Sequence, residues 1–476
     1  MSIAEAVGPI LFARRCDRSL YHLSALMVLQ PGAPPALYPM GGKNALPIEL
    51  ASICGRVIWR YDFVLPATDR AFYVLDGVRY AVTADLAEDA RIAYVSCNGQ
   101  ATADDERDLD ERNHMWRRLA DEHERAPFSL MLHGGDQLYA DEVVEAHPAL
   151  KAWANSDEEE MSAHLFTSEL EAAAEAYFFH RYADLYAQPG IAFLLARVPS
   201  LMMWDDHDII DGWGSHDVAM LDSPVGQGLF QVARRMFLFF QMASSEQAPD
   251  PRLQNGGRTL SVASSFPGFD IIAPDLRSER RPDGILGPEG RLAVTRAFAG
   301  SSNGSRLFLM SSVPLLGPRL SFIESFIGIV PRLRRYEDDL RDQWQSRTHR
   351  EEWRRFLLML ERTVAEKGGD VTVLSGEIHL ATRGEMPFAD GGCLRQLVAS
   401  GIAHDPPPRL YARALGWLAW LGEDPLQGRP IRMRPLPGQR RIYAAERNYL
   451  VLERQGQQWT ASWELEGSGR TPALDI

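Results

Sequence analysis

Four short apolar segments of this sequence are each followed at once by side chains that can bind metal ions. These side chains are Cys97 after residues 92–96, Asp136 and Tyr139 after residues 130–135, Asp206 and His207 after residues 201–204, and Glu377 and His379 after residues 371–374. Thiolate, carboxylate, phenolate and imidazole groups are all metal ligands. A mixed set of O, N and S donors that includes a tyrosinate suits a hard trivalent ion such as iron beside a divalent ion that prefers oxygen.

The second of these segments, Leu130–Asp141, is the clearest. Its apolar run ends in Gly134-Gly135, and Asp136 follows directly. This order is typical of a buried parallel strand that delivers a carboxylate to its C-terminal end. A carboxylate at that point could bridge two metal ions about 3.5–4 Å apart, which would clamp the attacking and leaving oxygens of an in-line displacement at phosphorus. The alternative is a surface loop in which Asp136 caps the next helix.

Three of the clusters also have a simpler interpretation when each is taken alone. Cys97 fits a small buried hydrophobic residue, residues 205–208 fit a polar loop with capping carboxylates, and His379 fits a structural histidine. The recurrence of the pattern after four segments favours a metal site. Acidic residues gathered at several strand ends repel each other and cost stability unless a cation holds them.

The strands and helices that must position these side chains can be predicted from the pattern of apolar and polar residues along the 476-residue chain. Strand and helix signals alternate from about residue 89, which predicts an α/β fold. Residues 1–88 contain short alternating segments separated by Pro- and Gly-rich turns, which predict a small N-terminal β-sandwich domain. We therefore expect a β-rich domain over 1–88 and a catalytic domain over 89–476, in which strands in 441–464 complete a sheet.

Composition narrows the classes of function. The net charge of −14 argues against a surface that coats nucleic acid, though not against a nucleotide-sized substrate. Four cysteines without a CxxC pair argue against a zinc ribbon and a disulfide framework. There is no signal peptide, no twin-Arg signal and no run of roughly 18 apolar residues that could span a bilayer, so we expect a cytoplasmic, soluble protein. Residues 410–421 are apolar and Trp-rich but too short to span a membrane, and are predicted to form a buried helix.

Three motifs carry a more specific resemblance. Gly135–Tyr139, Trp204–Asp208 and Leu374–His379, in this order, resemble the signatures of the PhoD-like alkaline phosphatases, a branch of the calcineurin-like metallophosphoesterases. Asp275–Ser278 and Val398–His404 are supporting matches. The resemblance implies a four-layer αββα sandwich, phosphomonoesterase or phosphodiesterase activity on a small phosphate ester, and an iron–calcium centre.

The resemblance also implies roles for particular residues. The implied metal ligands are Cys97, Asp136, Tyr139, Asp206, Glu377 and His379. Of these, Cys97, Asp136 and Tyr139 match the motifs that bind Fe³⁺. The divalent ion is expected to be Ca²⁺, with Mn²⁺, Zn²⁺ and Mg²⁺ as alternatives. His207 falls where the superfamily has a catalytic histidine.

Two departures from the family's pattern involve acidic residues. The family usually has Asp where this chain has Glu377, whose side chain is one methylene longer, and this changes the ligand distance. After the Trp-Asp-Asp-His motif the family commonly has an acidic residue and then Asn, whereas this chain has Asp208 and then Asp211. An aspartate there repels a phosphate dianion unless it binds metal or is protonated.

The predicted reaction is hydrolysis without a covalent enzyme intermediate, in which the metals lower the pKa of a bound water and hydroxide attacks phosphorus in line. His207 and Asp211 are the candidate catalytic residues, with His207 bonded to a phosphoryl oxygen or protonating the leaving alkoxide. Arg277 is a candidate clamp for the non-bridging oxygens, with Arg234 and Arg235 as competitors, and a surface ion-pair cluster around Arg277 is equally compatible. The rival functions are hydrolysis of another ester or a phosphotriester, and a metal-binding scaffold without turnover.

Overall fold

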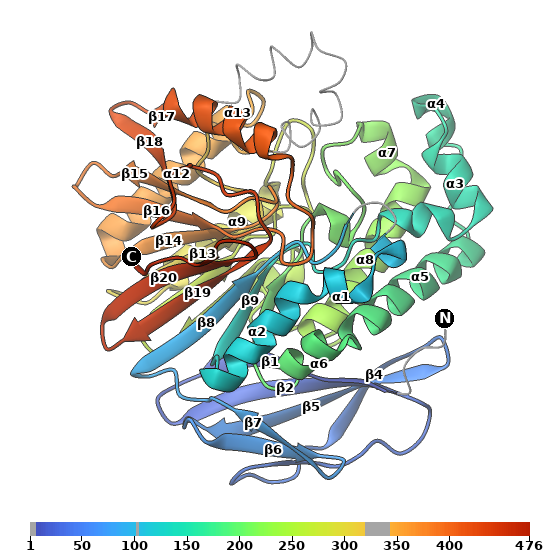
Figure 1. The fold of residues 1–476 in the computed structure, drawn as a ribbon. Helices are drawn as coiled ribbons and strands as arrows, with labels where there is room; N and C mark the ends of the chain where they lie inside the picture. The colour runs from blue at the N-terminus through green and yellow to red at the C-terminus, as the bar shows by residue number, and fades with distance from the viewer. Residues whose placement is uncertain (1–5, 101–103, 319–342) are drawn as a thin grey trace.

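The described residues form a mixed α/β fold built on two large β-sheets (Figure 1). The computed structural model describes residues 6–100, 104–318 and 343–476. Within them the larger sheet has 11 strands, in the spatial order β21 (Gly469–Arg470), β20 (Gln458–Leu465), β19 (Asn448–Gln455), β8 (Asp89–Val95), β9 (Leu130–Gly134), β10 (Ser200–Met203), β1 (Val7–Cys16), β2 (Leu20–Leu29), β5 (Arg56–Pro66) and β4 (Pro47–Ile53), with β22 (Leu474–Asp475) beside β20.

The second large sheet has eight strands in the described part of the chain. Their order is β11 (Val262–Phe266), β12 (Phe269–Ala273), β13 (Arg306–Ser311), β14 (Val371–Ser375), β16 (Cys393–Val398), β15 (Thr382–Pro387), β18 (Arg429–Arg434) and β17 (Glu423–Leu426). The middle strands of both sheets are parallel: β8, β9 and β10 in the first, and β12, β13, β14 and β16 in the second. Parallel strands present their C-terminal ends at one edge, where sites of α/β sheets are built.

The N-terminal strands extend the larger sheet. Strand β1 pairs in parallel with β10, with Phe12 opposite Ser200, and β2, β5 and β4 follow it in antiparallel order. A separate small sheet contains β3 (Leu37–Pro39), β6 (Ala71–Leu75) and β7 (Val78–Val82). At the other end of the larger sheet, β19 pairs with β8. The expected domain boundary after residue 88 stays a prediction.

The two large sheets share a hydrophobic core, as the alternation of side chains along β13 shows. Phe308 and Met310 belong to the core shared with the larger sheet, whereas Leu307 and Leu309 belong to a second core on the opposite face. This is the period of two expected for a strand buried on both faces. Trp459 of β20 lies edge-on to Phe308, with ring centroids 4.9 Å apart, and so joins the two sheets.

Helices lie beside both large sheets (Figure 1). Along the larger sheet lie α2 (His114–Arg125), α5 (Ser168–Tyr186), α6 (Pro189–Leu195) and α8 (Pro224–Met242), and along the second sheet lie α9 (Pro288–Gly300), α12 (Arg350–Lys367) and α13 (Arg409–Trp420). Shorter helices are α1 (Leu109–Arg112), α3 (Pro148–Ala154), α4 (Glu158–Met161) and α7 (Val218–Asp222). None of the described helices is long and apolar enough to cross a membrane. The cytoplasmic location stays a prediction.

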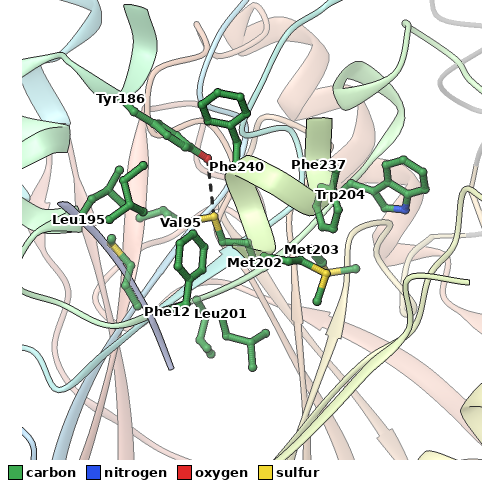
Figure 2. Packing of buried hydrophobic residues seen from close by; sticks show 14 of the residues in the cluster. Phe12, Val95, Tyr186, Leu195, Leu201, Met202, Met203, Trp204, Phe237 and Phe240 are labelled. Carbon is green, nitrogen blue, oxygen red and sulfur yellow. Dashed lines mark hydrogen bonds between the residues drawn. The ribbon is translucent and has the colours of Figure 1, made fainter. Parts of the chain in front are cut away.

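Side chains of strand β10 and of Trp204, which follows it, pack against buried residues of helices α5 and α8, as Figure 2 shows. Met202 points to Tyr186 of α5, whose hydroxyl lies 3.7 Å from the Met202 sulfur. Trp204 packs on Phe237 of α8 with ring centroids 5.3 Å apart, and its indole N–H donates a 2.9 Å hydrogen bond to Asp275. Full burial of an apolar side chain such as Phe stabilises the folded state by about 1.5–3 kcal/mol relative to leaving it exposed. The carboxylates that follow Trp204 therefore start from a rigid position.

The prediction of a buried helix over residues 410–421 is wrong for one of its faces. Ala412, Leu415 and Ala419 of α13 are buried. Trp417 and Trp420 are 82% and 83% exposed, the highest values among the described large hydrophobic residues. Apolar composition alone does not tell which side of a short helix the rest of the chain covers.

Candidate metal centre

The C-terminal ends of four parallel strands meet at one point between the two sheets. Cys97 donates its N–H to the carbonyl of Gly135 at 3.2 Å, which joins the end of β8 to the end of β9. Gly376 donates to Ser312, which joins the ends of β14 and β13. A Cβ on Gly376 would lie 2.4 Å from the Ser96 hydroxyl, so only glycine permits this approach of the second sheet to the first.

The backbone itself is unusual at the predicted ligands. Cys97, Asp136, Glu377 and His379 have φ values of 54°, 53°, 62° and 53°, and they make up four of the eight non-glycine residues with positive φ in the described chain. Such a conformation costs about 1–3 kcal/mol per residue and persists where the surroundings impose it, commonly at functional sites. All four residues follow shortly after the end of β8, β9 or β14.

Asp136 belongs to two groups of ligand atoms. Cys97, Asp136 and His379 form one group, and Asp136, Asp206 and His207 form the other; within each group the ligand atoms all lie within 4.8 Å of one another. Cys97 Sγ is 3.5 Å from Asp136 Oδ2. A carboxylate shared by two adjacent groups has the arrangement expected of a ligand that bridges two metal ions.

Tyr139 and His379 complete the side of the site that contains Cys97. The Tyr139 hydroxyl lies 3.2 Å from His379 Nε2, and the phenol ring stacks on His207 with centroids 4.1 Å apart. Burial, together with Cys97 and Asp136, raises the pKa of Tyr139 well above its ordinary value. The phenol therefore ionises only if a cation compensates for its charge.

Glu377 lies in the same pocket but outside both groups of ligand atoms. Its carboxylate accepts hydrogen bonds of 2.7 and 2.8 Å from Gln343 Nε2, and both residues line the pocket beside Asp136 and His379. Its role as a metal ligand stays a prediction.

Asp141 holds His207 in place. Nδ1 of His207 lies 3.0 Å from both carboxylate oxygens of Asp141, and the backbone N–H of Asp211 also donates to Asp141. Burial by itself lowers the pKa of His207, but Asp141 and Asp206 outweigh it and raise that pKa well above 6.5. The Asp211 side chain is 63% exposed, and its carboxylate lies 3.8 Å from His207 Nε2, beyond hydrogen-bond distance.

Arg277 is buried beneath the site, so the surface-cluster alternative is wrong for it. Its guanidinium is 0% exposed, pairs with Asp205, lies 3.3 Å from Asp206 Oδ1, and donates to the carbonyl of Trp213. It is absent from the described residues that line the pocket. These contacts hold the carboxylates of the Trp204–Asp208 motif, and the phosphate-clamp role stays a prediction. The competing arginines are engaged elsewhere, Arg234 with Glu246 and Arg235 with Glu171 and Glu175.

Replacing Arg277 should destabilise the protein strongly. Arg277→Met leaves the buried Asp205 carboxylate without its cationic partner, and breaking a buried ion pair in this way costs about 3–5 kcal/mol. Chemical denaturation should show that loss in the free energy of unfolding. The matched control is Arg281→Met, because the Arg281–Asp222 pair is exposed and should contribute less than about 1 kcal/mol. Equal effects of the two substitutions would contradict the burial argument.

Several residues of the site received no role from the sequence. His404 stacks on His379 with centroids 3.5 Å apart, and burial lowers its pKa to about 4. Ser400 lies 3.1 Å from Cys97 Sγ and accepts the N–H of His379. Both stand in the Val398–His404 motif after strand β16, so the recurrence of polar residues after an apolar strand was the signal that could have found them.

Asp208 is a buried carboxylate that accepts hydrogen bonds from two loops. It accepts the backbone N–H groups of Asp136, Leu138 and Asp205 at 2.9–3.1 Å and the side-chain amide of Gln241. Burial raises the pKa of Asp208 to about 7 in spite of these donors. The side chain therefore ties the β9 and β10 loops together, and it is absent from the described pocket lining.

The residues present fit a metal centre. Asp136 is 1% exposed, and its Oδ1 has no hydrogen-bond partner among the described residues. Burial, with Cys97 and Asp205 close by, raises the pKa of Asp136 well above its usual range. A cation would satisfy this oxygen and stabilise the carboxylate, and the thiol, carboxyl, phenol and imidazole groups around it are suitable donors.

Comparison with known proteins identifies the family of this chain. The family model described as PhoD related phosphatase matches residues 76–335, which is more than half of the chain. The chain belongs to this family. The resemblance inferred from the three motifs of this PhoD related protein is therefore confirmed.

One curated protein and one solved structure are similar to this PhoD related chain. It is 25% identical to the uncharacterized protein YGR266W of Saccharomyces cerevisiae, over 75% of this chain and 64% of that protein, so it spans less than two thirds of that relative's length. It also superposes on a solved structure of PhoD with a TM-score of 0.59 and 12% identity, covering 99% of this chain and 89% of that one. At that identity the likeness shows the fold alone.

Proposed function

We propose that this PhoD related protein is a metal-dependent hydrolase of phosphate esters. The observation that carries the proposal is the position of Asp136, a buried carboxylate shared by two groups of ligand atoms. Membership of a phosphatase family supports the same class of reaction. The expected four-layer order of helices, sheet, sheet and helices, and activity on diesters as well as monoesters, are parts of this proposal.

The proposed ligands divide into two sides around Asp136. Cys97, Tyr139 and His379 would hold Fe³⁺ on one side, and Asp206 would hold a divalent ion, Ca²⁺ in the first instance, on the other. Two such ions supply a nucleophile at neutral pH and stabilise the charge that develops on the phosphoryl oxygens.

His207 is the proposed general acid. Asp141 holds Nδ1, and His207 lines the pocket, so Nε2 is the ring atom left to face a bound ester. Because Asp141 and Asp206 raise its pKa, the ring carries the proton that the leaving alkoxide needs. The carboxylate of Asp211, 3.8 Å from Nε2, is placed to help hold the charged ring.

A panel of chromogenic esters tests the reaction class. After reconstitution with iron and calcium, the protein should hydrolyse p-nitrophenyl phosphate, bis-p-nitrophenyl phosphate or both, and should leave a p-nitrophenyl carboxyl ester and a phosphotriester unchanged. Faster turnover of either of the last two would favour the rival hydrolase. No turnover of any of the four would favour the metal-binding scaffold.

Tyr139 as an iron ligand predicts a colour. A phenolate bound to Fe³⁺ should give a charge-transfer band in the visible, and Tyr139→Phe should abolish it because the donor oxygen is gone. Tyr177→Phe is the matched control, since that phenol is hydrogen-bonded to Glu142, away from the ligand groups. The absorption spectrum of the iron-loaded protein checks the assignment. A band that survives Tyr139→Phe, or a colourless iron-loaded protein, would contradict it.

A further inference from the structure

Helix α13 has an apolar face that no described part of the chain covers. Leu410, Trp417, Trp420 and Leu421, at and just beyond the helix, are between 62% and 83% exposed. Leu410, Trp417 and Leu421 recur at the spacing of one helical stripe. The opposite face, with Ala412, Leu415 and Ala419, packs into the second core. A helix that is apolar on both faces needs an apolar partner on each of them.

The segment of sequence that contains this stripe is basic, although the whole chain is acidic. Residues 409–441 contain seven arginines and two acidic residues, a net charge of +5 in a chain of net charge −14. Arg409 and Arg413 on α13, and Arg432, Arg440 and Arg441 nearby in sequence, are exposed and form no ion pair with another described residue. Exposed indoles close in sequence to arginines that have no described acidic partner are complementary to an anionic lipid surface.

The covered face of α13 leads to the candidate metal centre. Tyr411 and Leu415 of the helix line the same pocket as Asp136, Asp206 and His379. Much of the remaining lining is apolar and includes Leu316, Ile378, Val398 and Met433. One short helix therefore separates an exposed apolar surface from an apolar pocket that contains the proposed ligands.

We propose that the outer face of α13 docks on an anionic lipid surface and that the pocket behind it takes the hydrocarbon part of a lipid phosphate ester. The docking stands on the exposed stripe and its arginines alone. The choice of substrate rests on the proposed function as well, since it assigns a phosphate ester to the metal centre. With only 12 residues, α13 would lie along the surface and not span it.

Vesicle flotation with the full chain tests the docking without any need for turnover. The protein should float with vesicles of equimolar phosphatidylcholine and phosphatidylglycerol and stay behind with phosphatidylcholine alone. The double substitution Trp417→Ser/Trp420→Ser should weaken binding by about tenfold or more, and Arg409→Ser/Arg413→Ser by roughly fivefold for each arginine. The matched control is Leu46→Ser/Leu165→Ser, because these leucines are 78% and 72% exposed and lie outside α13.

Several results would overturn the docking. The first is that the wild type floats with neither kind of vesicle. The second is that the tryptophan double variant floats as well as the wild type. A wild type that is dimeric by light scattering, with a monomeric tryptophan variant, would assign the stripe to a second copy of the chain. Blue-shifted emission of these two indoles in the free protein would show that the protein itself covers them.

Inhibition by alkyl phosphates tests the proposed role of the pocket separately from the docking. Octyl phosphate should inhibit hydrolysis of the chromogenic ester with a Ki at least about tenfold lower than that of methyl phosphate, because burying each methylene stabilises the bound ester. Equal Ki values would overturn the substrate assignment and leave flotation unaffected. If the protein floats with the vesicles but hydrolyses no ester, the proposed function is contradicted and the docking proposal still holds.

Discussion

Asp136→Asn is expected to remove most of the bound metal and nearly all hydrolysis. The carboxylate is shared by both groups of ligand atoms, so its loss weakens both metal positions at once. An amide has about the same shape but supplies only one oxygen donor and no negative charge, and it cannot bridge two cations. Elemental analysis of the purified variant, together with turnover of the chromogenic phosphate ester, measures both effects.

The control for this substitution is Asp121→Asn. Asp121 is an exposed aspartate on α2 that belongs to neither group of ligand atoms, so the variant should keep its metal content and rate. Asp136→Asn should also stay folded, because removing a buried carboxylate removes a source of repulsion with Cys97 and Asp205. An Asp136→Asn protein with wild-type metal content and activity would show that the carboxylate does not bridge two metals.

His207→Gln is expected to lower kcat by about 10²–10⁴-fold, the usual contribution of a general acid. The wild-type rate should fall as pH rises through the pKa of His207, which Asp141 and Asp206 hold above 6.5, because the acid is the charged form. The variant should lose this limb of the pH profile. Rate against pH for both proteins checks the assignment.

The matched control is His22→Gln, a histidine on strand β2 outside both groups of ligand atoms. Its kcat and pH profile should be those of the wild type. The iron absorption band should persist in His207→Gln, since Cys97, Tyr139 and His379 are unchanged. A fall in kcat of less than tenfold, or a pH limb that remains, would contradict the role of His207 as general acid.

The sequence by itself determined the mixed α/β class of fold and indicated side chains that lie close together in the candidate metal centre. Apolar strands followed at once by ligand-type residues indicate strand ends, because parallel strands present their C-terminal ends at one edge of a sheet. Cys97, Asp136, Tyr139 and His379 lie together in the structure for this reason. The succession of residue types along the chain is sufficient to infer that these side chains meet.

Other features depend on which distant segments pack together, and only the tertiary structure decided them. The sequence does not encode locally that Arg277 turns inward to Asp205, that Asp141 holds His207, or that β1 pairs with β10. The same holds for α13, whose composition predicted a buried helix although its tryptophans face outward. Burial and pairing of a side chain are set by the surfaces that meet it, and those surfaces come from residues far away in the sequence.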